Sequence, residues 1–364
     1  MLKLRRGSVV SIDPLVVEVA GERRRAWVDE RTIGQVAEGD EVIVNVEALD
    51  LALGSGGFDV IHANLTRGLD DPGSAPEHVM KLNYTSLQHP VAPIEVQVRS
   101  AESDARSEAE PRSAGAVPVL VLPLHGHLAP AAWAARQAAP ELKLGFVQTA
   151  GGALPGGLSR DIAELRGRGL LSGDITAGPC HGGSLEAISL PGAIDAGRCV
   201  LGWDAVLVGP GPGIIGSDSR LGHGGMAALD SAHAALALGA PTLISPRLSS
   251  GDSRPRHRGL SHHTATVLQM LLADVRVVVP SLEASERATI GGADASEAIE
   301  QVRAACGERH ELVAELADLD GYAATELSST TMGRGIDEDR LFFAAALAAG
   351  RALAQAATRS AEAG

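Results

Sequence analysis

The stretch GPGPGIIGSDSRLGHGG, residues 209–225, joins a strand pattern to a helix pattern and indicates the fold class. It follows the short apolar run DAVLV, residues 204–208, which is typical of a buried strand. It precedes an alanine-rich run, residues 226–238, which is typical of a helix. Open α/β sheets bind their ligands where a strand ends in such a loop. The sequence therefore predicts a ligand site here.

The glycines of this loop suit an anion. A residue without Cβ lets backbone N–H groups approach a ligand closely, and the start of the following helix attracts negative charge. We predict that Gly211, Gly213, Gly216 and Ser217 contact the ligand. The letters GPGIIG fit the dinucleotide pattern GxGxxG, but Asp230 comes only 14 residues after Gly216 and no P-loop lysine is present. A tight turn without a ligand is the structural alternative.

Composition favours a soluble globular protein. The chain has 364 residues, enough for two domains, and its 45% apolar content excludes global disorder. The net charge of −14 argues against binding to nucleic acid or to a membrane surface. The basic N-terminus lacks a long apolar segment behind it, so we expect a cytoplasmic protein. Three cysteines are too few and too scattered for a disulfide framework or a zinc ribbon.

The pattern changes twice along the chain. Residues 1–98 contain short strand patterns with turn residues every eight to twelve positions, and an extended connector, which predict a small closed β-barrel. Residues 99–116 are polar and charged, without large apolar side chains, which predicts a flexible loop or linker.

Residues 117–285 alternate between strand and helix patterns, which predicts a mainly parallel sheet with helices on both faces. We place the strands at residues 117–124, 142–149, 174–176, 204–208, 241–245 and 275–279, and take the last of these as the final strand of the sheet. Residues 286–364 are mostly helical in pattern and are expected to pack on this α/β domain.

Histidines gather in the α/β region. Eight of the twelve lie between His125 and His263, mostly beside glycine at predicted strand ends, and the strand ends of a parallel sheet share one edge. Histidine transfers protons near neutral pH. We predict five catalytic groups: His125, His257, His262, His263 and Asp252. The structural alternative is that several of these histidines are buried core or turn residues.

A divalent metal is a second role for these histidines. The pattern HGH is compatible with metal ligation, and the candidate ligands are His125, His127 and His262 with a carboxylate from Asp252 or Asp218. No full metal signature such as HExxH is present.

Arginines in the same region suit an anionic substrate. The planar guanidinium group matches carboxylate and phosphate oxygens, and we predict that Arg256, Arg258 and Arg334 pair with the anion. Thiolate catalysis by Cys180 beside His181 is a further alternative. No GxSxG elbow is present to mark a serine nucleophile.

Four stretches carry a resemblance to a known family: HGHLAP at residues 125–130, GPGPGIIG at 209–216, RHRGLSHHT at 256–264 and TMGRG at 331–335. On these motifs the chain resembles an uncharacterised bacterial family, a domain of unknown function, over nearly its whole length. The resemblance implies no activity, substrate or catalytic residue.

Three functions are consistent with the sequence. The first is an enzyme, a hydrolase or group transferase, that acts on a small molecule bearing phosphate or carboxylate and uses acid/base or metal chemistry. The second is a non-catalytic regulatory protein that binds a nucleotide or metabolite. The third is a structural protein that assembles as a homo-oligomer through its histidine loops.

Overall fold

The computed structural model describes residues 1–51, 57–67, 69, 79–98, 116–282, 290 and 292–363. The chain forms two compact units, Met1–Ala92 and Pro93–Gly364. The predicted linker, residues 99–116, lies outside the described residues except for Ala116.

The first unit contains the predicted closed barrel, with strand order β1-β2-β3-β5-β4 and closure between β4 and β1. In β4, buried valines alternate with more exposed residues because successive side chains of a strand point to opposite faces. A valine-rich core and Ile61 fill the barrel. The strands are β1 (Leu4–Ile12), β2 (Leu15–Val19), β3 (Glu22–Trp27), β4 (Glu41–Asn45) and β5 (Asp59–Asn64).

Smaller elements complete this unit. Two short helices, α1 (Glu30–Ile33) and α2 (Glu47–Asp50), occur in the connections of the barrel. Two further strands, β6 (Val79–Lys81) and β7 (His89–Val91), pair with each other in an antiparallel sheet.

The second unit is built on an eight-stranded sheet of order β11-β10-β9-β12-β8-β13-β16-β17, in which all neighbours are parallel. Its central strands are fully buried runs of mainly apolar residues, as expected of a parallel sheet covered on both faces. The strands are β8 (Val119–Val121), β9 (Leu144–Thr149), β10 (Gly173–Ala177), β11 (Leu185–Ala187), β12 (Ala205–Pro210), β13 (Thr242–Ile244), β16 (Arg276–Pro280) and β17 (Glu311–Glu315). The predicted fold class is confirmed.

The prediction that residues 275–279 form the last strand is wrong. β17 pairs in parallel with β16 and forms one edge of the sheet. It has no fully buried residue, and its sequence ELVAE carries only a weak apolar signal. At the opposite edge, β11 was not predicted either, because only one of its three residues is buried.

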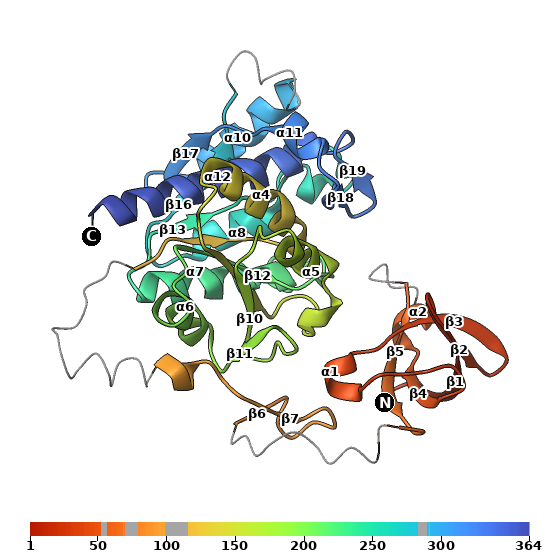
Figure 1. Ribbon diagram of the computed structural model, residues 1–364. Helices are drawn as coiled ribbons and strands as arrows, with labels where there is room; N and C mark the ends of the chain where they lie inside the picture. Colours follow the sequence, from red (N-terminus) through yellow and green to blue (C-terminus); the bar gives the residue numbers. More distant parts are fainter. Residues whose placement is uncertain are drawn as a thin grey trace, which may run out of the picture. The chain divides into compact units, whose positions relative to one another are not determined.

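Helices cover the sheet in two layers (Figure 1). One layer contains α4 (Leu128–Ala138), α5 (Arg160–Gly167), α11 (Leu319–Ala323) and α12 (Arg340–Ala363), with α12 packed along α4. In the other layer, neighbouring helices pack on one another in the order α6 (Leu190–Cys199), α7 (Ala227–Ala237), α8 (His262–Met270) and α10 (Gly292–Cys306).

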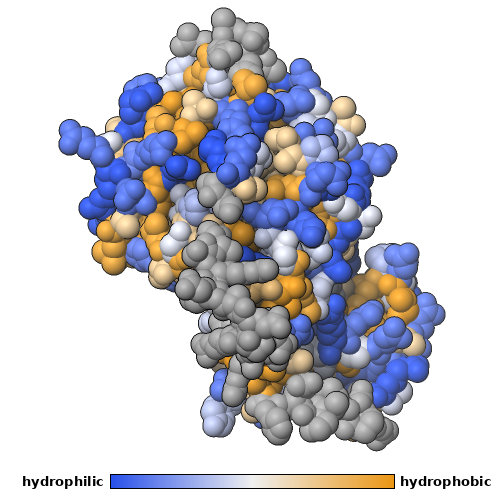
Figure 2. Space-filling model, turned by 60° about the vertical axis from the view of Figure 1, so that its left-hand side comes forward, coloured by the Kyte–Doolittle hydropathy of each residue, from blue (hydrophilic) through white to orange (hydrophobic). Residues whose placement is uncertain are grey.

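Helix α12 is the central helix of the first layer. Its segment Arg340–Glu362 is long and apolar enough to cross a membrane, but 83% of its apolar window is buried inside the protein. Burial against α4 and the sheet therefore accounts for its apolar sequence. On the face shown in Figure 2, hydrophilic side chains are interspersed with apolar ones.

The connections create a switch point in the centre of the sheet. Strand β8 lies between β12 and β13 and leads to α4 in one layer, whereas β12 and β13 lead to α7 and α8 in the other. Neighbouring strands whose connections leave toward opposite faces open a crevice at their carboxyl ends. The loops after β8, β12 and β13 therefore meet where ligands bind in this class of fold.

Candidate metal centre

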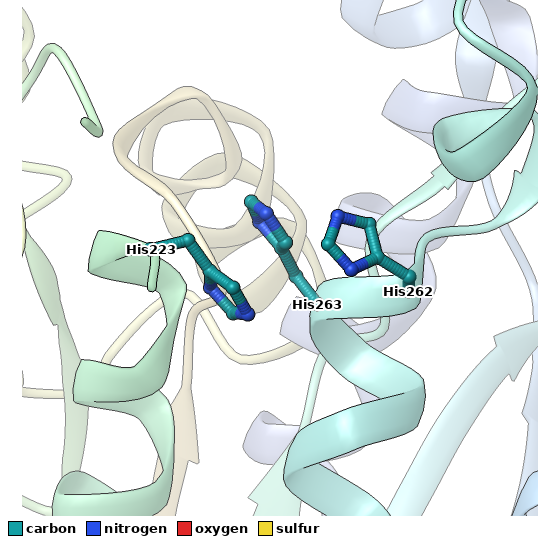
Figure 3. Close-up of side chains that lie close together, drawn as sticks. All are labelled: His223, His262 and His263. Carbon is teal, nitrogen blue, oxygen red and sulfur yellow. The ribbon is translucent and has the colours of Figure 1, made fainter. Parts of the chain in front are cut away.

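Four histidines meet at the carboxyl edge of the sheet. His223 follows β12 and precedes the short helix η3 (Gly224–Met226), while His257 ends η4 (Pro255–His257). His262 and His263 are the first residues of α8. The ring centroids of His263 lie 3.6 Å from His223, 4.4 Å from His262 and 4.8 Å from His257. Figure 3 shows three of these rings turned toward one another from two separate segments.

Local structure fixes the segment that carries three of these histidines. Two short strands, β14 (Leu248–Ser249) and β15 (Gly259–Leu260), pair in an antiparallel sheet and close the loop between them. Ser261 then caps α8 by accepting a hydrogen bond from the backbone N–H of His263. The Ser261 hydroxyl also lies 2.8 Å from Nδ1 of His257, so one serine positions both the helix start and the His257 ring.

His223 is oriented as a metal ligand. Its Nε2 lies 3.0 Å from the backbone oxygen of Arg220, and a carbonyl can only accept, so Nε2 carries the proton. Nδ1 is therefore an acceptor, and it is buried without a hydrogen-bond partner. Metal-bound histidines commonly donate their second ring N–H to such a carbonyl.

His262 and His263 complete the group. Nε2 of His262 is also buried without a partner. One ring nitrogen from each of His223, His262 and His263 lies within 4.8 Å of the other two. A tetrahedral ion at about 2.0–2.1 Å from each nitrogen would bring the nitrogens to about 3.4 Å from one another. Because an imidazole binds a metal in its own ring plane, closing this group around one ion requires His223 and His263 to turn out of their stacked arrangement.

Gly225 leaves room for this arrangement. A Cβ atom at position 225 would lie 3.0 Å from Nδ1 of His223 and 3.0 Å from Nδ1 of His263. A side chain at position 225 would therefore crowd both nitrogens, which favours glycine there. The unpartnered buried acceptor of His223 makes this group a candidate for a cation.

The surroundings keep these histidines neutral, which is the metal-binding form. Burial, followed by positive charge on Arg247, lowers the pKa of His257 to about 3. Burial and then His223 lower the pKa of His263 to about 2. Burial likewise lowers the pKa values of His223 and His262.

A buried ion network lies beside the histidines. Burial of Asp252 opposes its ionisation, but hydrogen bonds from Arg254 hold the pKa of Asp252 well below its usual range. Arg334 pairs with Asp339 at 3.0 Å and lies 3.6 Å from Asp252. Arg334 lies on a hairpin, β18 (Thr330–Thr331) and β19 (Arg334–Gly335), that returns to this site from far along the chain.

The predicted ligand set His125, His127 and His262 is not brought together. Among the described residues, the one group of three potential ligands whose ligand atoms lie within 4.8 Å of one another is His223, His262 and His263. His125 instead bonds the Pro210 carbonyl at 3.1 Å and the Ser159 hydroxyl at 2.7 Å.

His127 is a core histidine. It is fully buried, lies 2.8 Å from the Ser245 hydroxyl and packs edge-on against Phe342 at 4.6 Å. The HGH pattern at residues 125–127 therefore forms a strand-end turn, the short helix η1 (His125–His127), with both rings engaged by other parts of the fold.

The predicted glycines have a packing role in the structure. A Cβ at Gly211 would lie 2.3 Å from the backbone oxygen of Ala153, so this loop needs glycine to lie against the loop after β9. Gly213 has a left-handed backbone with φ of 75°, and Gly216 forms an isolated bridge with His223. The Ser217 hydroxyl donates to the Gly222 carbonyl. These contacts shape the loop that presents His223, and they leave anion binding by these residues a prediction.

Two predicted arginines make pairs on the surface. Arg256 pairs with exposed Asp218 at 2.8 Å, and Arg258 pairs with Asp294 at 3.5 Å. Sequence reasoning placed neither His223 nor Arg247 among the site residues. His223 could have been found from its position between glycines at a strand-to-helix turn, whereas Arg247 gives no local signal.

A family model matches residues 25–350, nearly the whole chain, and is described as a protein of unknown function (DUF3866). The chain belongs to the DUF3866 family. The match confirms the predicted resemblance to a family of unknown function and assigns no activity. Comparisons with curated proteins and with solved structures find no match.

Proposed function

We propose that this DUF3866 member is a divalent-metal-dependent enzyme, a hydrolase or group transferase, that acts on an anionic small molecule. The observation that carries this proposal is His223, whose Nε2 is bonded to a carbonyl and whose buried Nδ1 has no partner beside two further histidines. Three neutral imidazoles with an open coordination position are typical of catalytic rather than structural zinc sites.

The chemistry follows from this ligand set. A divalent ion there would polarise a substrate oxygen or lower the pKa of a bound water. His257 is placed to hydrogen-bond a water or substrate oxygen at this group, because its ring lies 5.0 Å from that of His262. Ser261 holds the His257 ring through Nδ1, which leaves Nε2 for that contact.

The test is turnover of small phosphate and carboxylate esters by protein that is first stripped of metal and then reloaded with Zn²⁺, Mn²⁺ or Co²⁺. We expect turnover only after reloading, and we expect His262→Ala to abolish it. His233→Ala is the matched control, since His233 lies on α7 of the same layer and is bonded to the backbone N–H of Leu272. Turnover that survives both chelation and His262→Ala would overturn the proposal.

A further inference from the structure

Arg247, which lies between β13 and β14, contacts the start of α8, the helix that carries His262 and His263. Its backbone N–H donates to the Thr264 hydroxyl at 3.0 Å, and its carbonyl accepts from the Ser261 N–H at 2.9 Å. These two bonds bracket His262 and His263 in the sequence. Arg247 is therefore fixed beside the start of α8.

The guanidinium of Arg247 is buried and incompletely paired. Only 5% of the side chain is exposed, and Nε is buried without a hydrogen-bond partner. Its Nη2 has two long contacts, 3.4 Å to Asp252 and 3.4 Å to the sulfur of Met332. A buried charge is costly unless it is paired and hydrogen-bonded, so this arginine lacks a partner that would satisfy it.

The charges of the network leave one positive charge in excess. Arg254 bonds Asp252 closely, at 2.7 Å and 2.9 Å, and Arg334 bonds Asp339 at 3.0 Å. Asp339 is further occupied by Ser249 at 2.6 Å and by backbone N–H groups. Three guanidiniums thus share two carboxylates, and Arg247 holds the weakest of the close contacts.

The metal centre adds to this excess. Its three ligands are neutral imidazoles, so a bound divalent ion would keep its full charge. The ion and Arg247 together would present three positive charges. A phosphate dianion compensates more of that charge than a carboxylate does, and its oxygens match the guanidinium fork.

We propose that Arg247 binds a phosphate group of the substrate, with its unpaired Nε–H and its Nη2 directed to the phosphate oxygens. This inference rests on the proposed function, because it names the anionic group that the enzyme recognises. It assigns that role to Arg247 in addition to the arginines predicted from the sequence.

The experiment is calorimetric titration of inorganic phosphate into metal-free and Zn²⁺-loaded protein. We expect phosphate to bind both forms, and the loaded form more tightly. Arg247→Gln and Arg247→Lys should each weaken binding at least about tenfold, since a charge-assisted bidentate contact is lost. Arg247→Lys keeps the charge beside Asp252 and guards against a folding defect in Arg247→Gln.

Arg276→Gln is the control. Arg276 is the first residue of β16, so it lies at the amino ends of the strands, away from the carboxyl ends that carry the site, and it pairs with Glu311. Acetate is expected to bind at least about tenfold more weakly than phosphate. Equal phosphate binding by wild type and folded Arg247→Lys would overturn the inference, and so would equal affinity for acetate. The metal-free titration tests Arg247 even if the three histidines bind no metal, so the two proposals can fail separately.

Discussion

His223 and His263 stack face to face, with ring centroids 3.6 Å apart and ring planes 9° apart. The two rings come from loops that follow different strands, β12 and β13. Two imidazolium ions could not stack so closely without strong repulsion, and burial lowers the pKa of both rings. The stack therefore favours two neutral rings, and these rings must leave the stacked arrangement to bind one ion together.

Gly225→Ala is expected to impair metal binding without unfolding the protein. The added methyl group would occupy the space bordered by Nδ1 of His223 and Nδ1 of His263, and the rings would have to move apart. We expect Zn²⁺ affinity to fall at least about tenfold, as when the support of a metal ligand is disturbed. Gly157→Ala is the control, because a Cβ there meets nothing within 4 Å. Equal affinity in the two variants would exclude the proposed role of Gly225.

Gly350→Ala is expected to destabilise the larger unit. A Cβ at Gly350 would lie 2.1 Å from the backbone oxygen of Ala131, where α12 packs on α4. Overpacking of this kind costs about 2–3 kcal/mol in the free energy of unfolding. Gly167→Ala, in open space at the end of α5, should instead stabilise by about 0.5–1 kcal/mol. Urea denaturation of both variants checks the contrast, and a stable Gly350→Ala would show that the helices separate easily.

The fold was predictable because its strands are short apolar runs bounded by glycine and proline. The central strands β9 and β12 are fully buried and stand out for this reason. Edge strand β17 is half exposed, so its sequence lacks that signal. Pairing with β16 gives it its place, and such long-range pairing cannot be seen in local patterns.

His127→Gln is expected to reduce the pH dependence of stability. Burial, and then the charge of Arg247, lowers the pKa of His127 to about 3 in the folded protein. An unfolded histidine titrates near 6.5, so between these values the unfolded state binds a proton that the native state excludes. The contribution of His127 to the free energy of unfolding is therefore fully present above about pH 6.5. It is lost as the pH falls, because the unfolded state then gains a proton.

At pH 5 this single group costs about 2 kcal/mol relative to pH 7. Urea midpoints at the two pH values should therefore differ more for the wild type than for His127→Gln, whose amide keeps a polar end beside Ser245. His233→Gln, a half-buried control on α7, should behave as the wild type. An unchanged pH dependence in His127→Gln would contradict the burial argument.

The candidate site was only partly predictable. His257, His262 and His263 were identified because they are clustered in one polar segment, and the structure does bring their rings together. The pattern HGH suggested His125 and His127 as ligands, but spacing in sequence does not report what each ring bonds in the core. His223 joins the group through loop packing between glycines, and Arg247 through backbone bonds to α8.

The most direct measurement is the affinity of the metal-free protein for Zn²⁺, obtained by competition with a chromophoric chelator. We predict one ion per chain, and we predict that His223→Ala, His262→Ala and His263→Ala each weaken binding at least about a hundredfold. His127→Gln should leave the affinity unchanged. Absence of Zn²⁺ binding by the wild type, or unchanged affinity in folded His223→Ala and His263→Ala, would contradict the metal centre.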